Sequence, residues 1–297
     1  MGLPADQLFI GVDGGGTSCR ARIRDAGGRL LGEGRGGPAN ARLGDAAFAE
    51  ILKTCRLALA AAGLGDADFG HIHAGFGLAG TAQAEDRAFI LGQRHPFASL
   101  ALDTDAYAAW LGAFGGKDGA ILIVGTGSCG LAVVGGKRFN VGGWGADISD
   151  EGSGMAIGRA TIRRALWALE GMAKHTSLAD AVLAEFDRSP EKIVPWAAAA
   201  KPADYARFAP IVLDFASRAD PLATSILREA GDDLGRMIMR LVAIGAAKVA
   251  LVGGLAAPIV PFLPDAVRPH LIQPEADAVD GAILLARQTV FGEARAG

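Results

Sequence analysis

The stretch of the sequence with the clearest chemical potential is a glycine cluster that follows a short apolar run. The cluster reads Asp13-Gly14-Gly15-Gly16-Thr17. Three successive glycines leave backbone N–H groups unshielded, and these donors, with the threonine hydroxyl, suit phosphate oxygens. The Asp13 carboxylate, at the end of the predicted strand, could hold Mg²⁺ through water, because this ion takes few carboxylates and keeps several waters. A sharp hairpin would also use glycines, so this turn alone leaves both interpretations open.

A second glycine-rich turn, Gly125-Thr126-Gly127-Ser128, follows another apolar run later in the chain. A Gly-Gly pair comes after each of the two turns at nearly the same distance, and such self-similarity indicates a duplicated domain. Two hairpins at equivalent places could face one triphosphate from both sides, which favours phosphate binding over a purely structural role. Neither hairpin has the Lys-Ser/Thr ending of a Walker A loop, and neither opens a helix as GxGxxG does. Those two nucleotide-binding folds are therefore disfavoured.

The elements that must position the first hairpin follow a simple order. Apolar alternation, turns and an Ala/Leu-rich run predict three strands, a helix, a strand, a helix and a strand across residues 1–115. The repeat of the hairpin predicts a second α/β domain over residues 116–297. Two such halves would leave a cleft between them, and ligands favour inter-domain clefts.

The second half also carries a long insertion, over about residues 178–219, in which prolines separate short helical segments and no chemistry is evident. Around it we expect a helix over 154–169, a helix over 222–243, a strand over 249–252 and a final helix from about residue 278. The second half is therefore expected to be an α/β domain with a helical addition.

Composition narrows the class of protein. The 297 residues are 51% hydrophobic and 21% charged, which allows a large core and two domains. A net charge of -3 and the lack of a long basic run argue against nucleic acid as a ligand. Cys19, Cys55 and Cys129 form no CxxC pair, which fits neither a disulfide framework nor a usual metal site, so a reducing cytoplasm is the expected compartment. No segment of the sequence predicts a signal peptide or a membrane span.

An aspartate in the first half is the candidate general base. Asp105 follows the apolar residues 100–102 and precedes a helical run over 106–111, which places it at the expected cleft. A carboxylate there can accept the proton of a hydroxyl group that attacks a γ-phosphate. The alternative role is a helix N-cap, a position that favours aspartate, although Thr104 or Asp103 could fill it instead.

These features together resemble the actin-like ATPase superfamily, which includes actin, heat-shock chaperones, hexokinases, sugar kinases and the ATPases that activate acyl-CoA dehydratases. Within it, the sequence is most similar to the N-acetylglucosamine and glucosamine kinases, in the BadF/BadG/BcrA/BcrD-type branch. Besides the two hairpins, the motifs that carry the resemblance are Pro38-Ala39-Asn40, Asp103-Thr104-Asp105-Ala106, Gly142-Gly143-Trp144-Gly145, Ser149-Asp150-Glu151-Gly152-Ser153 and Val252-Gly253-Gly254-Leu255. The resemblance implies two ribonuclease H-like domains that bind ATP and Mg²⁺ and transfer the γ-phosphate to O6 of N-acetylglucosamine or glucosamine.

The resemblance also implies roles for individual residues. It makes Asp105 the catalytic base, and it lets the backbone at Gly253 and Gly254 approach the adenine and ribose, where a plain turn is the alternative. The residues expected to contact phosphate are Gly14, Gly15, Gly16, Thr17, Thr126 and Gly127. The residues expected to bind the sugar are Asn40, Asp105, Ser128, Cys129, Gly143, Trp144, Gly145 and Asp150.

Three of the expected sugar residues have structural alternatives. Asn40, on a loop, can exchange hydrogen bonds with sugar hydroxyls or stabilise a turn. Trp144, between glycines, can offer an aromatic face to a sugar or pack into the core. Asp150 falls near a helix start, which favours acidic residues regardless of function. Cys129 departs from the eukaryotic pattern, in which an asparagine touches the sugar.

Two other functions stay open on the sequence. An ATPase that activates an acyl-CoA dehydratase or reductase needs clustered cysteines for a bridging iron–sulfur cluster, which three scattered cysteines do not provide. A kinase of another hexose is the second alternative, and relatives of the glucokinase type often carry a zinc-binding cysteine cluster that this sequence lacks. The sequence does not distinguish glucosamine from N-acetylglucosamine as the substrate, or a monomer from a homodimer. It also does not define the extent of domain closure or the role of the insertion.

Overall fold

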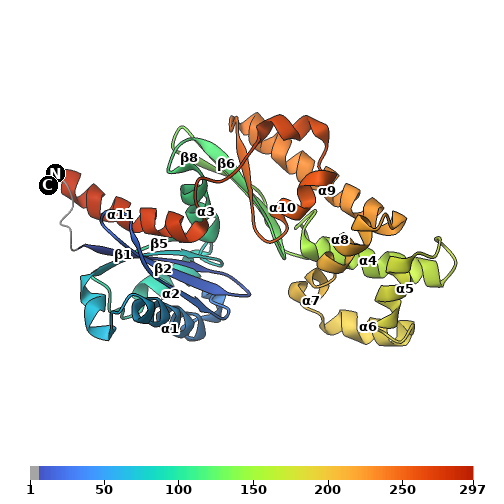
Figure 1. Ribbon diagram of the computed structural model, residues 1–297, viewed down its shortest axis with the longest axis horizontal. Helices are drawn as coiled ribbons and strands as arrows, with labels where there is room; N and C mark the ends of the chain where they lie inside the picture. The colour runs from blue at the N-terminus through green and yellow to red at the C-terminus, as the bar shows by residue number, and fades with distance from the viewer. Residues whose placement is uncertain (1–6, 297) are drawn as a thin grey trace. The chain divides into compact units, whose positions relative to one another are not determined.

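The computed structural model describes residues 7–296. The chain forms two compact units (Figure 1). One unit consists of the chain up to Lys117 together with the segment from Pro274 onward, and the other consists of Asp118–Gln273. Each unit contains its own five-stranded sheet. The chain therefore folds as two α/β units, as the repeated hairpin predicts.

The sheet of the first unit has the strand order β3-β2-β1-β4-β5. Strands β1, β2 and β3 form an antiparallel meander, whereas β4 and β5 run parallel to β1. This order confirms the predicted succession of strands and helices. Because β1, β4 and β5 are parallel, their carboxyl ends meet at one edge of the sheet. The strands are β1 (Leu8–Gly14), β2 (Cys19–Asp25), β3 (Leu30–Gly36), β4 (Ile72–Leu78) and β5 (Ser99–Thr104).

Helices cover both faces of this sheet. Helix α1 (Asp45–Ala61) packs against β2 and β3, while α11 (Ala278–Ala296) packs against β1, β4 and helix α3 (Asp105–Phe114). Figure 1 shows α1 and α11 on opposite sides of the strands. A shorter helix, α2 (Ala84–Gly92), leads to β5. The first unit is thus a three-layer helix–sheet–helix arrangement.

Strand β2 has two chemically different faces, because successive side chains of a strand point to opposite sides of the sheet. On the face toward α11, Arg20, Arg22 and Arg24 pair with the carboxylates of Asp277 and Asp280. We call these three arginines the arginine ladder. The side chains of the opposite face are buried in the core with α1, and they are Cys19, Ala21 and Ile23.

The place of α11 corrects the domain boundaries expected from the sequence. Residues 116–297 were predicted as the second domain, but the segment from Pro274 onward belongs to the first unit. The reason is close packing through glycines: a Cβ at Gly75 of β4 would lie 1.9 Å from the carbonyl oxygen of Ala282. A Cβ at Gly281 would lie 1.8 Å from the carbonyl oxygen of Ala108 on α3. The helix thus approaches the first unit to a distance that only glycine permits.

The second sheet repeats the topology of the first, in the order β10-β9-β6-β7-β8. Strands β6, β7 and β8 form an antiparallel meander, and β9 runs parallel to β6. Strands β8 and β10 were not predicted, because β8 is largely exposed and lacks apolar alternation while β10 has two residues. The strands are β6 (Gly119–Val124), β7 (Ser128–Val134), β8 (Lys137–Gly142), β9 (Val249–Val252) and β10 (Leu271–Ile272).

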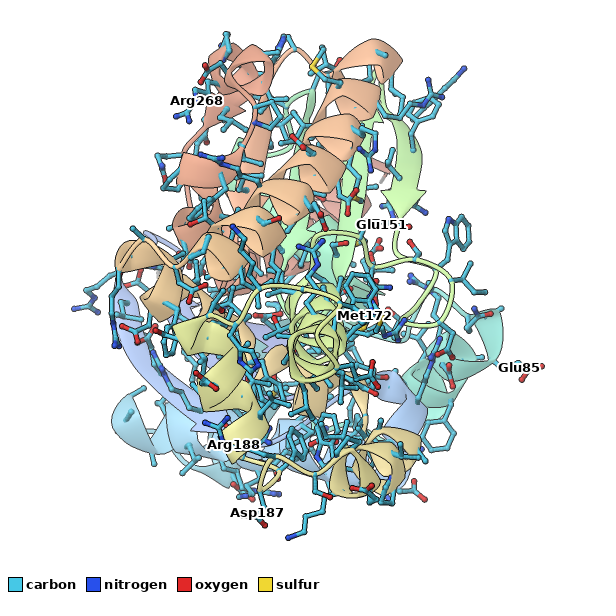
Figure 2. The ribbon with its side chains drawn as sticks, turned by 90° about the vertical axis from the view of Figure 1, so that its right-hand side faces the viewer. Glu85, Glu151, Met172, Asp187, Arg188 and Arg268 are labelled. Carbon is cyan, nitrogen blue, oxygen red and sulfur yellow. The ribbon has the colours of Figure 1, made fainter. Side chains whose placement is uncertain are left out.

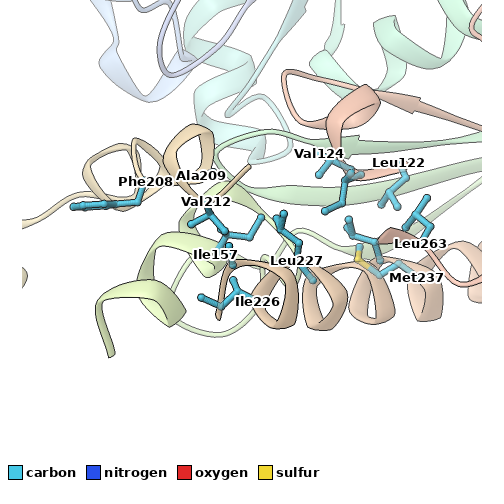
Figure 3. Close-up of a cluster of buried hydrophobic side chains, with 14 of the residues drawn as sticks. Leu122, Val124, Ile157, Phe208, Ala209, Val212, Ile226, Leu227, Met237 and Leu263 are labelled. Carbon is cyan, nitrogen blue, oxygen red and sulfur yellow. The ribbon is translucent and has the colours of Figure 1, made fainter. Parts of the chain in front are cut away.

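The predicted insertion is a set of short helices that shares the core of the second unit. In Figure 3, Phe208, Ala209 and Val212 of the insertion lie in one apolar cluster with Ile157 and Ile226. The insertion is therefore part of the unit and not a separate appendage. No helix among the described residues is long and apolar enough to cross a membrane. The helices are α4 (Gly154–Leu169), α5 (Ser177–Ala184), α6 (Pro190–Ala199), α7 (Pro202–Ala206), α8 (Ala209–Ser217), α9 (Pro221–Ile244) and α10 (Ala256–Ile259).

Candidate active site

The first glycine hairpin connects β1 to β2 and has an open tip. The Gly15 N–H donates to the Ser18 carbonyl at 2.9 Å, which closes the turn. Gly16 and Thr17 are exposed, and a Cβ added at Gly16 would meet nothing within 4 Å. Gly14, by contrast, is buried at the base of the hairpin. The tip therefore presents backbone donors and a hydroxyl to solvent, where a phosphate group could reach them.

Asp13 has a partner that the sequence analysis did not foresee. Its Oδ2 accepts hydrogen bonds from Nη2 of Arg20 at 2.7 Å and from Nε of Arg20 at 3.2 Å. Nη1 of the same arginine donates to Oδ2 of Asp277 at 3.1 Å. In the sequence, Arg20 is one of three arginines at alternate positions of the second strand, a pattern that by itself suggests only an exposed strand face. The structure makes that residue the link between Asp13 and α11.

Asp105 is the first residue of α3 and does not cap it. The side chain of Thr104 accepts the N–H of Tyr107 at 3.1 Å, so Thr104 is the N-cap. The N-cap role considered for Asp105 is therefore filled by its neighbour Thr104, so helix capping does not explain the Asp105 carboxylate. The strand register places Asp13 beside Gly77, and Gly77 beside Asp103. With strands about 4.8 Å apart, Asp13 and the end of β5 lie about 10 Å from each other at the same sheet edge.

The surroundings of Asp105 tune its acidity. Burial disfavours the charged form and raises the pKa of this carboxyl from 3.8 to about 6, and the negative charge of Asp13 acts in the same direction. Hydrogen bonds from the local backbone oppose the shift but do not cancel it. A base is most effective when its pKa lies near the working pH. Asp105 thus has the acidity of a general base.

Asn40 lies on a loop that is bonded to the first hairpin. Its Oδ1 accepts the N–H of Arg42 at 3.0 Å and caps the short turn Ala41–Leu43. The N–H of Ala39, one residue earlier, donates to the carbonyl of Gly15 at 2.9 Å. The turn-stabilising role is therefore present, and it uses only the carbonyl oxygen of the amide. The Nδ2 group has no partner within the described part of the chain and stays available as a donor.

The second glycine hairpin is fixed to the start of α4. The N–H groups of Gly154 and Met155 donate to the carbonyls of Gly125 and Thr126 at 2.8 and 3.0 Å. The Ser128 hydroxyl is buried and donates to the carbonyl of Glu151 at 2.7 Å. The Glu151 side chain itself is exposed (Figure 2). Hairpin and helix start therefore form one rigid piece of the second unit.

Asp150 lies directly against this second hairpin. Its Oδ1 accepts the N–H of Ser128 at 3.3 Å, and a Cβ at Gly127 would come within 2.9 to 3.1 Å of its carboxylate atoms. Burial raises the pKa of this carboxyl. Its backbone has φ of 66°, a left-handed conformation that is uncommon for a residue with a side chain. Ser153 is the N-cap of α4 and the first turn holds no acidic residue, so Asp150 is not a helix-start carboxylate.

The loop that follows β8 presents an aromatic side chain to solvent. Trp144 is 73% exposed, which shows that the alternative of a core tryptophan is wrong. Gly143 packs against the strand: a Cβ there would lie 2.5 Å from the Cβ of Cys129. Gly143 and Gly145 both have positive φ, of 76° and 98°, so the loop takes a path that other residues rarely follow. Of the expected sugar residues of this loop, Gly143 thus stands beside Cys129 on β7.

The turn at Gly253 and Gly254 meets the end of β6, the strand that leads into the second hairpin. Gly253 has φ of 104°, and a Cβ there would lie 2.5 Å from the Val124 carbonyl oxygen. That oxygen accepts the N–H of Leu255 at 3.0 Å. A Cβ at Gly254 would meet nothing within 4 Å. The turn is thus tight at Gly253 and open at Gly254.

The structure groups the predicted residues in two sets, one in each unit. The first unit holds the first hairpin with Asp13, Asn40 and Asp105. The second unit holds the second hairpin with Asp150, the Trp144 loop and the turn at residues 253–254. Sequence reasoning missed Arg20, whose only signal was its place in the arginine ladder, and it missed the bond from Ser128 to residue 151.

Comparison with known proteins shows to which family the chain belongs. A model of the BadF/BadG/BcrA/BcrD ATPase family matches residues 10–286. The chain belongs to this family. Glucosamine kinase GspK of Vibrio cholerae serotype O1 is 41% identical over 279 residues, which cover 94% of this chain and 95% of that protein.

Solved structures show the same fold as this member of the family. A Chromobacterium violaceum protein assigned as an N-acetylglucosamine kinase is 36% identical, with a TM-score of 0.89 over 95% of this chain and 100% of that one. A ROK family glucokinase of Streptomyces griseus, solved with glucose and AMPPNP, is 20% identical, with a TM-score of 0.53 over 94% of this chain and 98% of that one. That likeness shows the fold alone. The two units have the two-domain actin-like ATPase fold that the sequence analysis expected.

Proposed function

We propose that this chain is an ATP-dependent amino-sugar kinase that phosphorylates O6 of glucosamine or N-acetylglucosamine. The similarity to the Vibrio cholerae glucosamine kinase and to the Chromobacterium violaceum protein supports this substrate class. The single observation that carries the proposal is the carboxylate of Asp105, which does not serve as the helix N-cap, lies at the same sheet edge as the first hairpin and has a pKa of about 6. A plain ATPase that activates a partner would have no need of a base for a sugar hydroxyl.

The residues of the chain divide the reaction between them. Gly16, Thr17, Thr126 and Gly127 bind the phosphate oxygens, while Gly14 and Gly15 shape the first hairpin, in which the Gly15 N–H is bonded to the Ser18 carbonyl. The turn at residues 253–254 accommodates the adenosine. Asp105 accepts the proton of the sugar O6 hydroxyl as that oxygen forms a bond to the γ-phosphorus. The bond from the γ-phosphorus to the β,γ-bridging oxygen breaks, and ADP leaves. Phosphoryl transfer needs little covalent help, so positioning and charge neutralisation supply most of the rate.

Asp13 is the residue that would hold Mg²⁺. Its Oδ1 accepts no hydrogen bond within the described part of the chain, and the side chain is 23% exposed. The described residues contain no group of three or more His, Cys, Asp or Glu that could enclose a metal. A lone carboxylate fits Mg²⁺, which keeps most of its waters and takes phosphate oxygens as ligands. When bound, the ion would neutralise charge on the phosphates.

The residues proposed to bind the sugar offer a donor, an acceptor and an aromatic face. Asn40 can donate from Nδ2, Asp150 can accept from hydroxyl or ammonium groups, and the exposed face of Trp144 can pack against the apolar face of a sugar ring. Ser128, Cys129, Gly143 and Gly145 shape the surroundings of these contacts. Cys129 stands where the eukaryotic relatives carry an asparagine, so this position offers the sugar no amide, which bears on the choice between the free amine and the N-acetyl group.

The positions of the cysteines argue against the alternative that the protein is an ATPase that activates an acyl-CoA dehydratase or reductase. Cys19 and Cys55 are buried in the core of the first unit, and burial raises the pKa of Cys19 to about 11 and that of Cys55 well above its ordinary value. Cys129 belongs to the second unit. Thiols that are buried and reluctant to ionise are poor ligands for a cluster shared between proteins. A kinase of another hexose is the alternative that a panel of sugars would reveal.

Substitution of the base tests the proposal. Asp105→Asn keeps the shape of the side chain but cannot accept the proton, so we expect kcat to fall by about 10²- to 10⁴-fold. Sugar binding, measured by calorimetry with glucosamine and N-acetylglucosamine, is expected to stay within a few-fold of wild type. Thr104→Ala is the matched control, because it removes the helix cap and keeps the carboxylate. An Asp105→Asn enzyme with undiminished turnover would overturn the assignment.

A further inference from the structure

We infer that Arg20 is a positioning residue that holds Asp13 for its metal and anchors that carboxylate to α11 through Asp277. The inference rests on the proposed function of Asp13. The guanidinium of Arg20 is shared between the two carboxylates: Nη2 and Nε donate to Oδ2 of Asp13, and Nη1 donates to Oδ2 of Asp277. One carboxylate lies at the end of β1 and the other immediately before α11.

The contacts leave a defined oxygen for the metal. Both donors of Arg20 converge on Oδ2 of Asp13, at 2.7 and 3.2 Å, and no donor within the described part of the chain reaches Oδ1. A carboxylate held through one oxygen cannot rotate freely, so Oδ1 keeps one orientation. Partners that orient a metal-ligating carboxylate affect metal affinity, and their substitution typically lowers it by about 10- to 100-fold.

Stability alone is a poor explanation of this pair. The side chains of Arg20 and Asp13 are 37% and 23% exposed, and ion pairs near the surface contribute little to the stability of a fold. The docking of α11 already has the pairs of Arg22 and Arg24 with Asp280. The bond from Arg20 to Asp13 adds nothing to that docking, since Asp13 belongs to β1. Its effect falls on the orientation of Asp13.

Asp277 is a second residue whose substitution can test the role of Arg20. It pairs with Arg20 and Arg22, and its Oδ1 also accepts the N–H of Asp280 at the start of α11. Asparagine caps helices as well as aspartate does. Asp277→Asn therefore keeps the helix start while it weakens the hold on Arg20. Asp280→Asn is the matched control, because it is the same change on the same helix and its partners, Arg22 and Arg24, do not touch Asp13.

The test is Mn²⁺ binding in the presence of ADP and without sugar, measured by calorimetry or by electron paramagnetic resonance. Arg20→Lys keeps the charge but has no planar fork to hold two carboxylates, and we expect it to weaken Mn²⁺ by about 10- to 100-fold. Asp277→Asn should weaken Mn²⁺ less, in the same direction, and Asp280→Asn should leave it unchanged. Melting temperatures establish that each variant is folded.

Three outcomes would overturn the inference: wild-type Mn²⁺ affinity in Arg20→Lys, equal losses in Asp277→Asn and Asp280→Asn, or no loss in Asp13→Asn. Since no sugar is present, these results are separate from those that test the kinase. A protein that phosphorylates no amino sugar would contradict the proposed function while the order of the Mn²⁺ affinities could still hold. If the protein phosphorylates an amino sugar but Arg20→Lys binds Mn²⁺ as tightly as wild type, only the positioning role of Arg20 is contradicted.

Discussion

At the scale of single residues, Asp105 combines two properties: it begins a helix that its neighbour caps, and its carboxyl has a raised pKa. Thr104 takes the capping position, so the carboxylate is not used for helix stability. Burial and the charge of Asp13 raise its pKa to about 6. An ionised Asp105 is therefore costly to the folded protein, and such a cost is typical of a residue kept for chemistry.

This cost predicts a pH-dependent gain in stability from Asp105→Asn. Because the folded pKa of about 6 lies above the unfolded value of 3.8, ionisation of Asp105 destabilises the fold at neutral pH and has no effect well below pH 4. The variant should be more stable than wild type by up to about 3 kcal/mol at pH 7.5. The gain should shrink as the pH falls from 6 to 4, as measured by urea unfolding.

Asp66→Asn is the control for that experiment, since this carboxylate of the first unit is exposed and its one ion pair among the described residues is with exposed Arg56. It should show no such gain at any pH. A melting curve of Asp105→Asn that coincides with wild type at pH 7.5 would mean that Asp105 is not buried in the way described.

The residues show what a sequence can and cannot predict about a site. Asp13, Asp105 and the glycines of the hairpins could be predicted as site residues because each follows an apolar strand, and the chemistry of the residue type then suggests its role. Arg20 could not be found in this way. Its contact with Asp13 depends on strand pairing, and its contact with Asp277 joins residues 257 positions apart.

At the scale of elements, α11 is the feature that the sequence placed wrongly. Its helical pattern was predicted, but a pattern of this kind does not say which sheet a helix covers. The determinants are glycines at Gly75 and Gly281 and the carboxylates that meet the arginine ladder. These determinants act across more than 150 residues of chain, so only the folded structure reveals them.

Gly281→Ala should therefore destabilise the first unit. The added Cβ would lie 1.8 Å from the carbonyl oxygen of Ala108 and 2.5 Å from the nitrogen of Gly112, and backbone atoms cannot yield as side chains do. We expect a loss of about 1 to 3 kcal/mol or more, as for other overpacked sites, in urea unfolding. Gly92→Ala, where a Cβ would meet nothing within 4 Å, is the control and should cost little. Equal stability of Gly281→Ala and wild type would contradict the close packing of α3 and α11.

At the scale of the whole molecule, the two units repeat one sheet order, and each places a glycine hairpin after its first strand. The duplication was predictable because the hairpin and the following Gly-Gly turn recur in the sequence. The boundaries were not, because the chain returns to the first unit at its end. The division of labour proposed here gives the base and Asp13 to the first unit and the Trp144 loop and Asp150 to the second.

The central claim is that ATP is consumed only to phosphorylate an amino sugar. The most direct measurement is ADP release by the purified protein with glucosamine, N-acetylglucosamine, glucose, N-acetylmannosamine and no sugar. We predict turnover with glucosamine or N-acetylglucosamine that exceeds the rate without sugar by at least about 10²-fold, the lower end of what a positioned base contributes. ADP release at the same rate with and without sugar would contradict the account and favour the activator ATPase.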